Sequence, residues 1–270
     1  MAITALYSAA SGMRALDTKL DVLANNLANV NTVGFKRSRT NFEDLLYDVR
    51  REPGIRNAED EPIPHGIEVG LGATVSGTQL NFAPGSVDTT GSPLDMMIQG
   101  EGFFQVTTIY QGQEVTAYTR AGNFTKNAVG NIVLGNTDGS TLEPPIQIPD
   151  DASLASVTIG LDGRVSHKDL ASQQIVELGQ IQLARFVNNE GLLSIGKNLF
   201  VQTDASGEPI EGNPREDGMG EIRGGALELS NVDPVRELIE LIITQRAFEL
   251  NSQAIKTADE SLQIIGNLRR

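Results

Sequence analysis

Apolar residues recur every seven positions along the first thirty residues. Two columns stay apolar through four heptads: Leu6, Met13, Leu20 and Leu27, and three residues further on Ala9, Leu16, Leu23 and Val30. This spacing predicts a narrow apolar stripe along one side of a helix about 40 Å long. An isolated helix cannot bury such a stripe, so the pattern requires a partner.

The last forty residues supply a candidate partner. The run from Asn231 to Pro234 predicts a helix start, with Asn231 or Asp233 as the N-cap and Pro234 in the first turn. The apolar column that follows is Leu241, Phe248, Ile255 and Leu262, flanked by Leu238, Ile242, Ala258 and Ile265. A second column of this helix is less apolar, because it contains polar residues such as Thr244 and Asn251. We therefore expect the two terminal helices to pair in a coiled-coil-like manner.

A different pattern fills the chain from about residue 67 to 230. Short β-prone stretches alternate with turn signals: Gly102–Val106, Asn131–Leu134 and Gln180–Phe186 among the stretches, Asp138-Gly139, Asp162-Gly163 and Ser206-Gly207 among the turns. This spacing predicts a mainly antiparallel β domain inserted between the helices, hence an α+β fold with nested domains. The expected domains are residues 1–30 with 232–270 (helical), 31–70 with 213–231 (connecting) and 71–212 (β-rich, outer). With aromatics at 5%, no core should be rich in large rings.

Composition narrows the classes of function. A net charge of −14 argues against a nucleic-acid partner, because phosphate binding draws on clustered Lys and Arg. The chain has no cysteine, which excludes disulfides and thiolate metal sites. No run of about 18 apolar residues suggests membrane insertion. Arg14, Asp17 and Lys19 interrupt any signal-peptide core, so export would proceed without cleavage of a signal.

No motif supports a catalytic or cofactor site. Gly191–Asn198 nearly fits a phosphate-binding loop, but Asn198 stands where Ser or Thr must bind magnesium, so a hairpin loop is expected. His65 and His167 are isolated, and no carboxylate pair stands out for acid–base work. We expect no enzyme activity and no cofactor. An enzyme or nucleotide-binding protein remains an alternative that a thermal-shift screen with nucleotides and metals would expose.

One segment after the first helix carries a specific resemblance. Asn25–Lys36 resembles the signature shared by the rod and hook proteins of the bacterial flagellum; the residues that carry it are Asn25, Asn26, Asn29, Thr32, Gly34, Phe35 and Lys36. Further blocks are similar to that family in the same order along the chain: Ser8–Met13, Gly100–Val106, Tyr118–Phe124, Ser230–Asp233 and Gln245–Glu249. The resemblance covers nearly the whole chain.

A second segment distinguishes members within the family. Phe42–Tyr47 followed by Arg51–Gly54 is similar to the segment of the members that build the distal rod, and Tyr47, Arg51, Pro53 and Gly54 mark it here. The hook protein is longer and lacks this segment. A proximal rod or hook-type axial subunit is the alternative. Met96 and Met97 stand where smaller aliphatic residues are usual, which we interpret as repacking of the core.

The resemblance implies a structural role. Such a subunit polymerises into a hollow helical drive shaft in the basal body, which crosses the periplasm, carries torque from motor to hook and lets export substrates pass. Implied partners are copies of itself, proximal rod and hook proteins, the surrounding ring bushing proteins and the type III export apparatus. Neither nucleic acid nor membrane insertion is implied.

The residues then take expected roles. The apolar stripes would form the subunit interface through Leu6, Met13, Leu16, Leu20, Leu23, Leu27, Leu238, Leu241, Phe248, Ile255 and Leu262. Asn29 and Asn31 would adopt turn or left-handed geometry, and Gly34 a positive φ. Lys36, Arg37 and Arg39 would face outward. Residues 43–66 would brace an adjacent subunit and stiffen the polymer.

Overall fold

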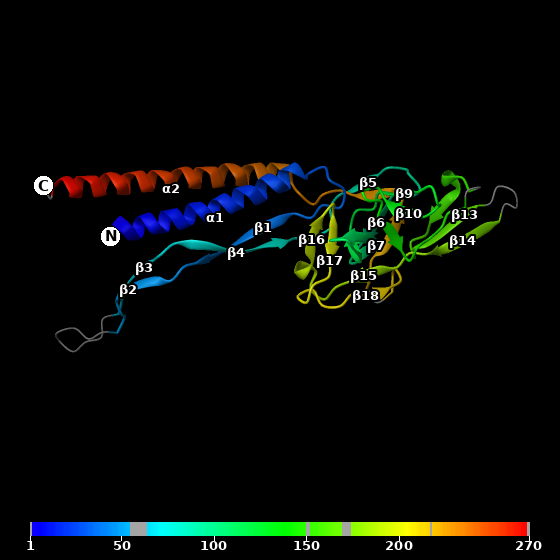
Figure 1. Ribbon diagram of the computed structural model, residues 1–270, viewed down its shortest axis with the longest axis horizontal. Helices are drawn as coiled ribbons and strands as arrows, with labels where there is room; N and C mark the ends of the chain where they lie inside the picture. Colours follow the sequence, from blue (N-terminus) through cyan, green and yellow to red (C-terminus); the bar gives the residue numbers. More distant parts are fainter. Residues whose placement is uncertain (1, 55–63, 150–151, 169–173, 217, 269–270) are drawn as a thin grey trace. The chain divides into compact units, whose positions relative to one another are not determined.

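A computed structural model describes residues 2–54, 64–149, 152–168, 174–216 and 218–268 (Figure 1). The chain divides into two compact units. Unit 1 comprises residues 1–28, 38–80 and 233–270, and unit 2 comprises residues 29–37 and 81–232. Residues 38–80 therefore group with the two helices, and residues 213–231 with the β-rich unit. An N-terminal helix, a mainly antiparallel β region and a C-terminal helix make the fold α+β, as predicted.

Unit 1 contains two helices and two pairs of strands. Its elements are α1 (Ala2–Ala28), α2 (Pro234–Leu268), β1 (Ser38–Asp44), β2 (Tyr47–Arg51), β3 (Ile67–Gly70) and β4 (Ala73–Leu80). β1 pairs with β4 and β2 with β3, both antiparallel. Within this unit α1 packs against α2 on one side and against β1 and β4 on the other (Figure 1). The helix pair is thus formed within a single chain.

Small residues let α1 approach the β1–β4 pair. Ser8 Oγ donates a hydrogen bond to the carbonyl of Gly70 at 3.1 Å, and Ser11 Oγ donates to the carbonyl of Leu71 at 3.4 Å. A Cβ atom added to Gly72, whose φ is +113°, would lie 1.9 Å from Ser11 Oγ. Residues 8–12 are therefore small because α1 meets the connection between β3 and β4 there at backbone distance.

The start of α2 is fixed by one side chain. Asp233 Oδ1 accepts hydrogen bonds from the backbone amides of Val235 at 3.0 Å and Arg236 at 3.3 Å. These amides have no partner inside the helix, so Asp233 is the N-cap. Pro234 follows in the first turn, where a missing N–H costs nothing. Of the two predicted candidates for the cap, Asp233 performs the role.

Unit 2 is built on a nine-stranded antiparallel sheet. Its central path is β16-β17-β8-β7-β11-β10-β9, and β15 pairs with both β7 and β18. The strands of this sheet are β7 (Phe103–Tyr110), β8 (Gln113–Thr119), β9 (Phe124–Lys126), β10 (Ile132–Leu134), β11 (Thr141–Glu143), β15 (Leu183–Arg185), β16 (Leu193–Gly196), β17 (Leu199–Val201) and β18 (Ile210–Gly212).

Three smaller sheets complete unit 2. One has the order β12-β13-β14, and two are pairs, β19-β6 and β20-β5. Their strands are β5 (Val87–Thr89), β6 (Met96–Gln99), β12 (Val157–Ile159), β13 (Arg164–Lys168), β14 (Ile175–Gln180), β19 (Glu221–Gly224) and β20 (Ala226–Glu228). Two short 3-10 helices, Leu154–Ser156 and Asn189–Gly191, lie between strands. The three β-prone stretches of the sequence overlap β7, β10 and the end of β14 with β15.

The core of unit 2 is apolar, with Phe104, Val106, Phe124, Ile132 and Leu183 among its buried members. A second group of side chains departs from the prediction that no core would be rich in rings. Edge-to-face contacts with centroids 4.7–6.2 Å apart join five rings: Phe82, Phe103, Tyr118, Phe186 and Phe200. Low overall aromatic content does not prevent local clustering, because these residues come from separate segments of the chain.

The near match to a phosphate-binding loop is a hairpin. β16 and β17 pair antiparallel, and Lys197 and Asn198 form the turn between them with φ of 56° and 60°. A phosphate-binding loop must lead into a helix, whereas this segment leads into strand β17. The hairpin interpretation of this segment is confirmed.

Candidate functional site: the helix pair and a buried charge cluster

The predicted stripes of α1 and α2 face each other in one chain. Leu23 is the most enclosed of them, at 4% exposed. The other predicted positions on the two columns are half-buried: Leu6, Met13, Leu16, Leu20 and Leu27 on α1, and Leu241, Phe248, Ile255 and Leu262 on α2. An ion pair of 2.9 Å between Lys19 Nζ and Glu240 Oε2 bridges the helices beside this seam. The stripes thus cover each other in part before any second copy is added.

The polar residues in the second column of α2 belong to the seam. Glu237 and Thr244 are each only 1% exposed, and Asn251 is half-buried. Thr244 Oγ1 donates to the carbonyl of Glu240 at 2.7 Å. A Cβ added to Gly12 of α1 would lie 3.4 Å from Asn251 Nδ2, so the helices also approach closely there. The heptad spacing outweighs the polarity of these residues in deciding which side faces α1.

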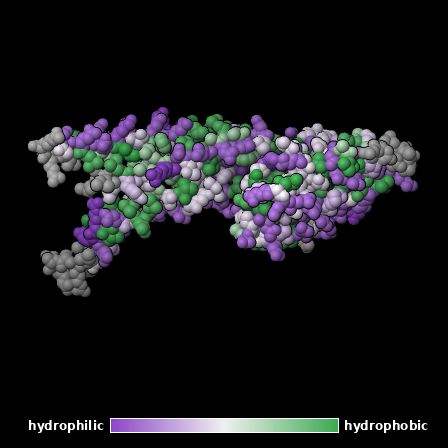
Figure 2. All heavy atoms as spheres, viewed as in Figure 1, coloured by the Kyte–Doolittle hydropathy of each residue, from purple (hydrophilic) through white to green (hydrophobic). Residues whose placement is uncertain are grey.

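The opposite side of α2 carries a second apolar stripe. Its six large side chains are 46–66% exposed: Val235, Leu238, Ile239, Ile242, Ile243 and Leu250. On the face shown in Figure 2, hydrophobic residues break the polar surface along the two helices. Leu238 and Ile242, predicted to flank the seam, are 46% and 56% exposed and so belong to this outer stripe as well. The spacing 235, 239, 242 and 243 is itself helical, and could have revealed this stripe.

Asn26 joins three elements of unit 1. Its Nδ2 donates to the carbonyl of Ser38 at 2.8 Å and to Glu237 Oε2 at 3.1 Å, and its Oδ1 accepts from the Ser38 amide at 3.0 Å. The side chain is fully buried, whereas the neighbouring Asn25 is exposed. An amide is needed because a carboxylate could neither donate to the carbonyl nor tolerate Glu237. This explains one polar position of the signature segment.

The rest of the signature turn belongs to unit 2. Thr32 bonds to Asn29 twice, from its backbone amide to the carbonyl at 3.2 Å and from Oγ1 to Oδ1 at 3.1 Å. Asn29 and Asn31 adopt turn geometry, one of the two predicted alternatives, and neither has a positive φ. Gly34 has φ +70°, as predicted, and a Cβ there would lie 2.5 Å from the amide nitrogen of Ala121. Phe35 is half-buried.

Lys36 does not face outward. It is 1% exposed, and its Nζ donates to Glu228 Oε1 at 2.7 Å and to the carbonyl of Ala83 at 2.8 Å. The prediction that Lys36 faces outward is wrong, because its ammonium group pairs with the buried carboxylate of Glu228, which comes much later in the sequence. Arg37 is half-buried and Arg39 is exposed. Sequence distance hid this partner, since 192 residues separate Lys36 from Glu228.

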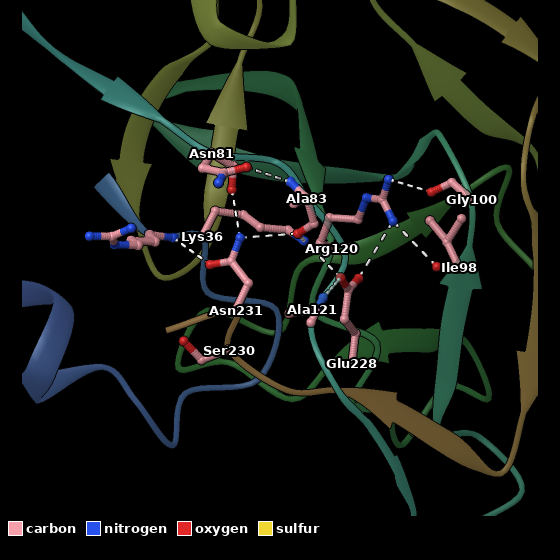
Figure 3. Close-up of polar contacts among 12 residues, drawn as sticks. Lys36, Asn81, Ala83, Ile98, Gly100, Arg120, Ala121, Glu228, Ser230 and Asn231 are labelled. Atoms are coloured by element: carbon pink, nitrogen blue, oxygen red, sulfur yellow. Dashed lines mark hydrogen bonds and ion pairs between the residues drawn. The ribbon is translucent and has the colours of Figure 1, made fainter. Parts of the chain in front are cut away.

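Glu228 holds a second buried cation. Arg120 is 4% exposed, and its Nη1 lies 3.5 Å from Glu228 Oε2. The same guanidinium donates to the carbonyls of Ile98 at 3.3 Å and Gly100 at 2.8 Å, and lies 5.3 Å from the centroid of the Phe103 ring. Figure 3 shows Lys36 and Arg120 approaching Glu228 from separate segments. One carboxylate therefore serves two cations, which we call the buried charge cluster.

Burial governs the protonation of both cations. Desolvation lowers the pKa of Lys36 below its usual value, and the attraction of Glu228 opposes that effect. Desolvation likewise lowers the pKa of Arg120, again opposed by Glu228. Removal of the carboxylate would leave two buried positive charges without compensation. Glu228 thus keeps both cations compensated in the interior of unit 2.

Three signature-like segments meet at this cluster. The Gly34 amide donates to the Glu228 carbonyl at 2.8 Å, and the Asn231 amide to the Phe35 carbonyl at 3.4 Å. Asn231 Oδ1 accepts from the Arg37 amide at 2.7 Å, while its Nδ2 donates to the carbonyls of Asn81 at 2.7 Å and Ala83 at 3.0 Å (Figure 3). Hydrogen bonds therefore hold together three segments of unit 2, near residues 36, 81 and 231.

The predicted rod-specific segment forms the β2–β3 hairpin arm of unit 1. Tyr47, Arg51, Pro53 and Gly54 are all exposed, and residues 55–63 lie outside the described part. Arg51 Nη2 donates to the carbonyl of His65 at 3.3 Å. A hydrogen bond to Asp44 raises the pKa of Tyr47. Leu46 is 83% exposed beside Tyr47, so the arm presents apolar side chains to solvent.

A polar groove of about 830 Å³ on unit 2 contains no catalytic arrangement. Its Glu143 accepts from Thr107 Oγ1 at 3.0 Å and Thr116 Oγ1 at 3.4 Å, and its Lys197 pairs with Asp138. Within the described residues, no three His, Asp or Glu side chains gather as metal ligands would. No helix in the described ranges combines the length and apolar character needed to cross a membrane.

These features are those of a structural subunit built on a pair of long helices. Three family models match the chain: "Flagella basal body rod protein" over residues 6–36, "Flagellar hook protein FlgE/F/G D1 domain" over 97–167, and "Flagellar basal body rod FlgEFG protein C-terminal" over 223–268. The first contains Lys36, the second Arg120 and the third Glu228, so each model contributes one member of the charge cluster.

Curated relatives agree along the whole chain. The flagellar basal-body rod protein FlgG of Borreliella burgdorferi is 42% identical, with 98% of each chain covered. FlgG of Agrobacterium fabrum is 43% identical (97% of each chain), and FlgG of Caulobacter vibrioides is 44% identical (98% of this chain, 99% of the relative). The chain belongs to the flagellar basal-body rod protein family. It is a structural subunit and not an enzyme.

Proposed function

We propose that this protein builds the distal part of the flagellar rod by polymerising into a hollow helical shaft. The shaft carries torque from motor to hook and lets exported proteins pass through its channel. The similarity to FlgG relatives over nearly all of the chain supports the distal position. Expected neighbours are proximal rod and hook proteins, the ring bushing proteins and the type III export apparatus. That apparatus exports the chain without cleavage of a signal peptide, and the shaft crosses the periplasm.

The observation that carries polymerisation is the outer apolar stripe of α2. A helix that is apolar on two opposite sides is normally buried on both, yet α1 covers only one side of α2. Full burial of an exposed Leu, Ile or Val contributes about 1.5–3 kcal/mol. Six half-exposed side chains would therefore contribute roughly 5–10 kcal/mol before the entropy cost of association. Neighbouring copies of the same chain can bury this stripe, and the same contact can repeat along a polymer.

We further propose coiled-coil geometry for the helix pair and a nested domain order with the β-rich unit on the outside of the shaft. The half-buried stripe residues of both helices, from Leu6 to Leu27 and from Leu241 to Leu262, then become fully buried by neighbouring helices. The exposed β2–β3 arm, marked by Tyr47, Arg51, Pro53 and Gly54, braces an adjacent subunit and stiffens the shaft.

The experiment compares assembly of the wild type with Leu20→Asp and Leu23→Asp. We expect both variants to keep a folded unit 2 but to form no filaments in sedimentation and electron microscopy. Ala24→Asp, at an exposed position of α1, is the control and should assemble more readily than either. Labelling of purified basal bodies with an antibody tests the location. Normal filaments from Leu23→Asp, or label away from the rod, would contradict the proposal.

A further inference from the structure

Unit 1 contains a groove beside the helix pair. It has a volume of about 380 Å³ and runs between α1 and the β1–β4 pair. Most of its lining residues are small or apolar, among them Ser11, Ala15, Thr18, Leu45, Ala73 and Val75. The groove is narrow because α1 approaches the strands through small side chains. It offers a channel into which a row of branched apolar side chains could insert.

The outer stripe of α2 is such a row. Val235, Ile239 and Ile242 lie one turn apart along the helix, on the side opposite Leu241 and Thr244 of the seam. In its own chain this stripe points away from α1, so it cannot enter the groove beside α1. The groove and the stripe cannot contact each other within one chain. The stripe of one copy can, however, contact the groove of another copy.

The charges beside the two features are opposite. Next to the groove, α1 exposes Asp17 and Asp21, one turn apart. Next to the stripe, α2 exposes Arg236 and Arg246, and Arg246 Nη1 pairs with Glu249 at 2.9 Å in the same helix. Arginine is suited to form hydrogen-bonded ion pairs with carboxylates across an interface. Complementary charge favours association of the two surfaces and sets their register.

The groove itself carries one cation, Arg14, which is exposed on its α1 side. Glu249, on the flank of the α2 stripe, is exposed and has the charge opposite to that of Arg14. Exchange of the internal Arg246–Glu249 pair for two pairs between copies would keep both of these side chains compensated. The polar rim of the groove therefore fits the polar rim of the stripe.

We propose that the α2 stripe of one copy inserts into the groove between α1 and β4 of the next copy. This inference rests on the proposed polymerisation and names the surfaces that perform it. The contact is heterologous, because different surfaces of the two copies meet. Repetition of a heterologous contact whose rotation does not close produces an open helical filament.

Charge reversal with mixing tests the proposal. One variant carries Asp17→Lys and Asp21→Lys, and a second carries Arg236→Glu and Arg246→Glu. Each places like charges across the contact, so each alone should assemble at a critical concentration at least tenfold above that of the wild type. An equal mixture should recover assembly, because the stripe of either variant then matches the groove of the other. Circular dichroism checks that both variants retain the helix pair.

The outcomes separate this proposal from the proposed function. If both variants assemble like the wild type, or if the mixture fails although both are folded, the interface lies elsewhere while polymerisation stands. If the wild type stays monomeric at every concentration, polymerisation itself is wrong. Recovery in the mixture also excludes a contact within one chain, because the compensating charges are on different molecules.

Cross-linking supplies an independent measurement. The natural chain has no cysteine, so Thr18→Cys in the groove with Ile239→Cys on the stripe gives one defined pair. Oxidation of the assembled double variant should produce a ladder of covalent oligomers. Thr18→Cys with Lys256→Cys, another exposed position of α2, is the matched control and should give no ladder. Equal ladders from both pairs would contradict the proposed docking.

Discussion

Lys36 Nζ donates a 2.7 Å hydrogen bond to Glu228 Oε1 at a site where both side chains are at most 1% exposed. The two residues belong to the first and last segments of unit 2, and Arg120 from the middle of the chain shares the same carboxylate. The cluster therefore closes only when three distant segments have come together. Its strength depends on Glu228 more than on either cation.

We predict that Glu228→Gln lowers the free energy of unfolding of unit 2 by about 3–5 kcal/mol, because it leaves two cations buried without a counter-charge. Lys36→Met should cost less, since Arg120 still pairs with Glu228. Chemical denaturation followed by fluorescence or circular dichroism measures both. Glu114→Gln, at an exposed position of β8, is the control and should change the value by less than about 0.5 kcal/mol. Equal losses from Glu228→Gln and Glu114→Gln would refute the prediction.

Asn26→Asp should destabilise the helix pair. The aspartate would lose both donated hydrogen bonds and place a second buried carboxylate against Glu237, which is 1% exposed. We expect a loss of about 2–4 kcal/mol, the cost of an unpaired buried charge and a lost bond. The measurement is the thermal melting of helical signal in circular dichroism. Asn25→Asp changes the exposed neighbour and should melt close to the wild type.

Tyr118 should be the last tyrosine to ionise. Burial, helped by Glu211 and Glu143, raises its pKa to about 12. Because the folded pKa exceeds the usual value of about 10, this group stabilises the folded state below pH 10, and that contribution is lost as pH rises from 10 to 12. Its size is about 3 kcal/mol, since one pKa unit corresponds to about 1.4 kcal/mol.

Absorbance titration measures this ionisation without interference, since the chain has no tryptophan. Tyr118→Phe should remove the most alkaline transition and flatten the loss of unfolding free energy between pH 10 and 12, relative to the wild type. Tyr7→Phe, at a position 58% exposed, should leave that transition in place. A wild-type titration complete by pH 11 would show that the Tyr118 phenol is not shielded.

The β2–β3 arm should affect stiffness more than assembly. Deletion of residues 48–69, with a short Gly-Ser link after Tyr47, removes the arm while β1 and β4 keep their pairing. We expect filaments that still form but bend more, seen as a shorter persistence length in electron micrographs. A second variant keeps the arm but replaces the exposed apolar side chains of Leu46 and Val49 with Ser, and its filaments should bend less than those of the deletion variant. Straight, stiff filaments from the deletion variant would rule out the bracing role.

The sequence predicted the features that local rules determine. A 3.5-residue period identified both helices and the side of each that faces the other, because helix geometry converts spacing directly into direction. Gly34 was predicted to need positive φ, and the run up to Asn198 to be a hairpin, from the preferences of single residues. Similar reasoning found the cap at Asp233 only as one of two candidates, since either side chain could have accepted the bonds.

The tertiary structure decided which polar residues are buried. Lys36 was predicted to face solvent together with Arg37 and Arg39, because basic side chains in a turn usually do. Its burial is tolerable only because it pairs with Glu228, 192 residues away in the sequence. In the same way Asn26 gains its role from Glu237, 211 residues distant. Sequence periodicity carries no information on such pairings, because they depend on strand register and on which chain segments return to one place.

What the amino-acid order determined by itself is therefore the set of elements: two amphipathic helices, turns at defined glycines, and many short strands. Only the folded structure decided which surfaces contact each other. The stripes of α1 and α2 cover each other, and this leaves the far side of α2 exposed. The reason is physical: local conformation follows from neighbouring residues, whereas burial and charge pairing follow from contacts between residues that only the folded chain brings together.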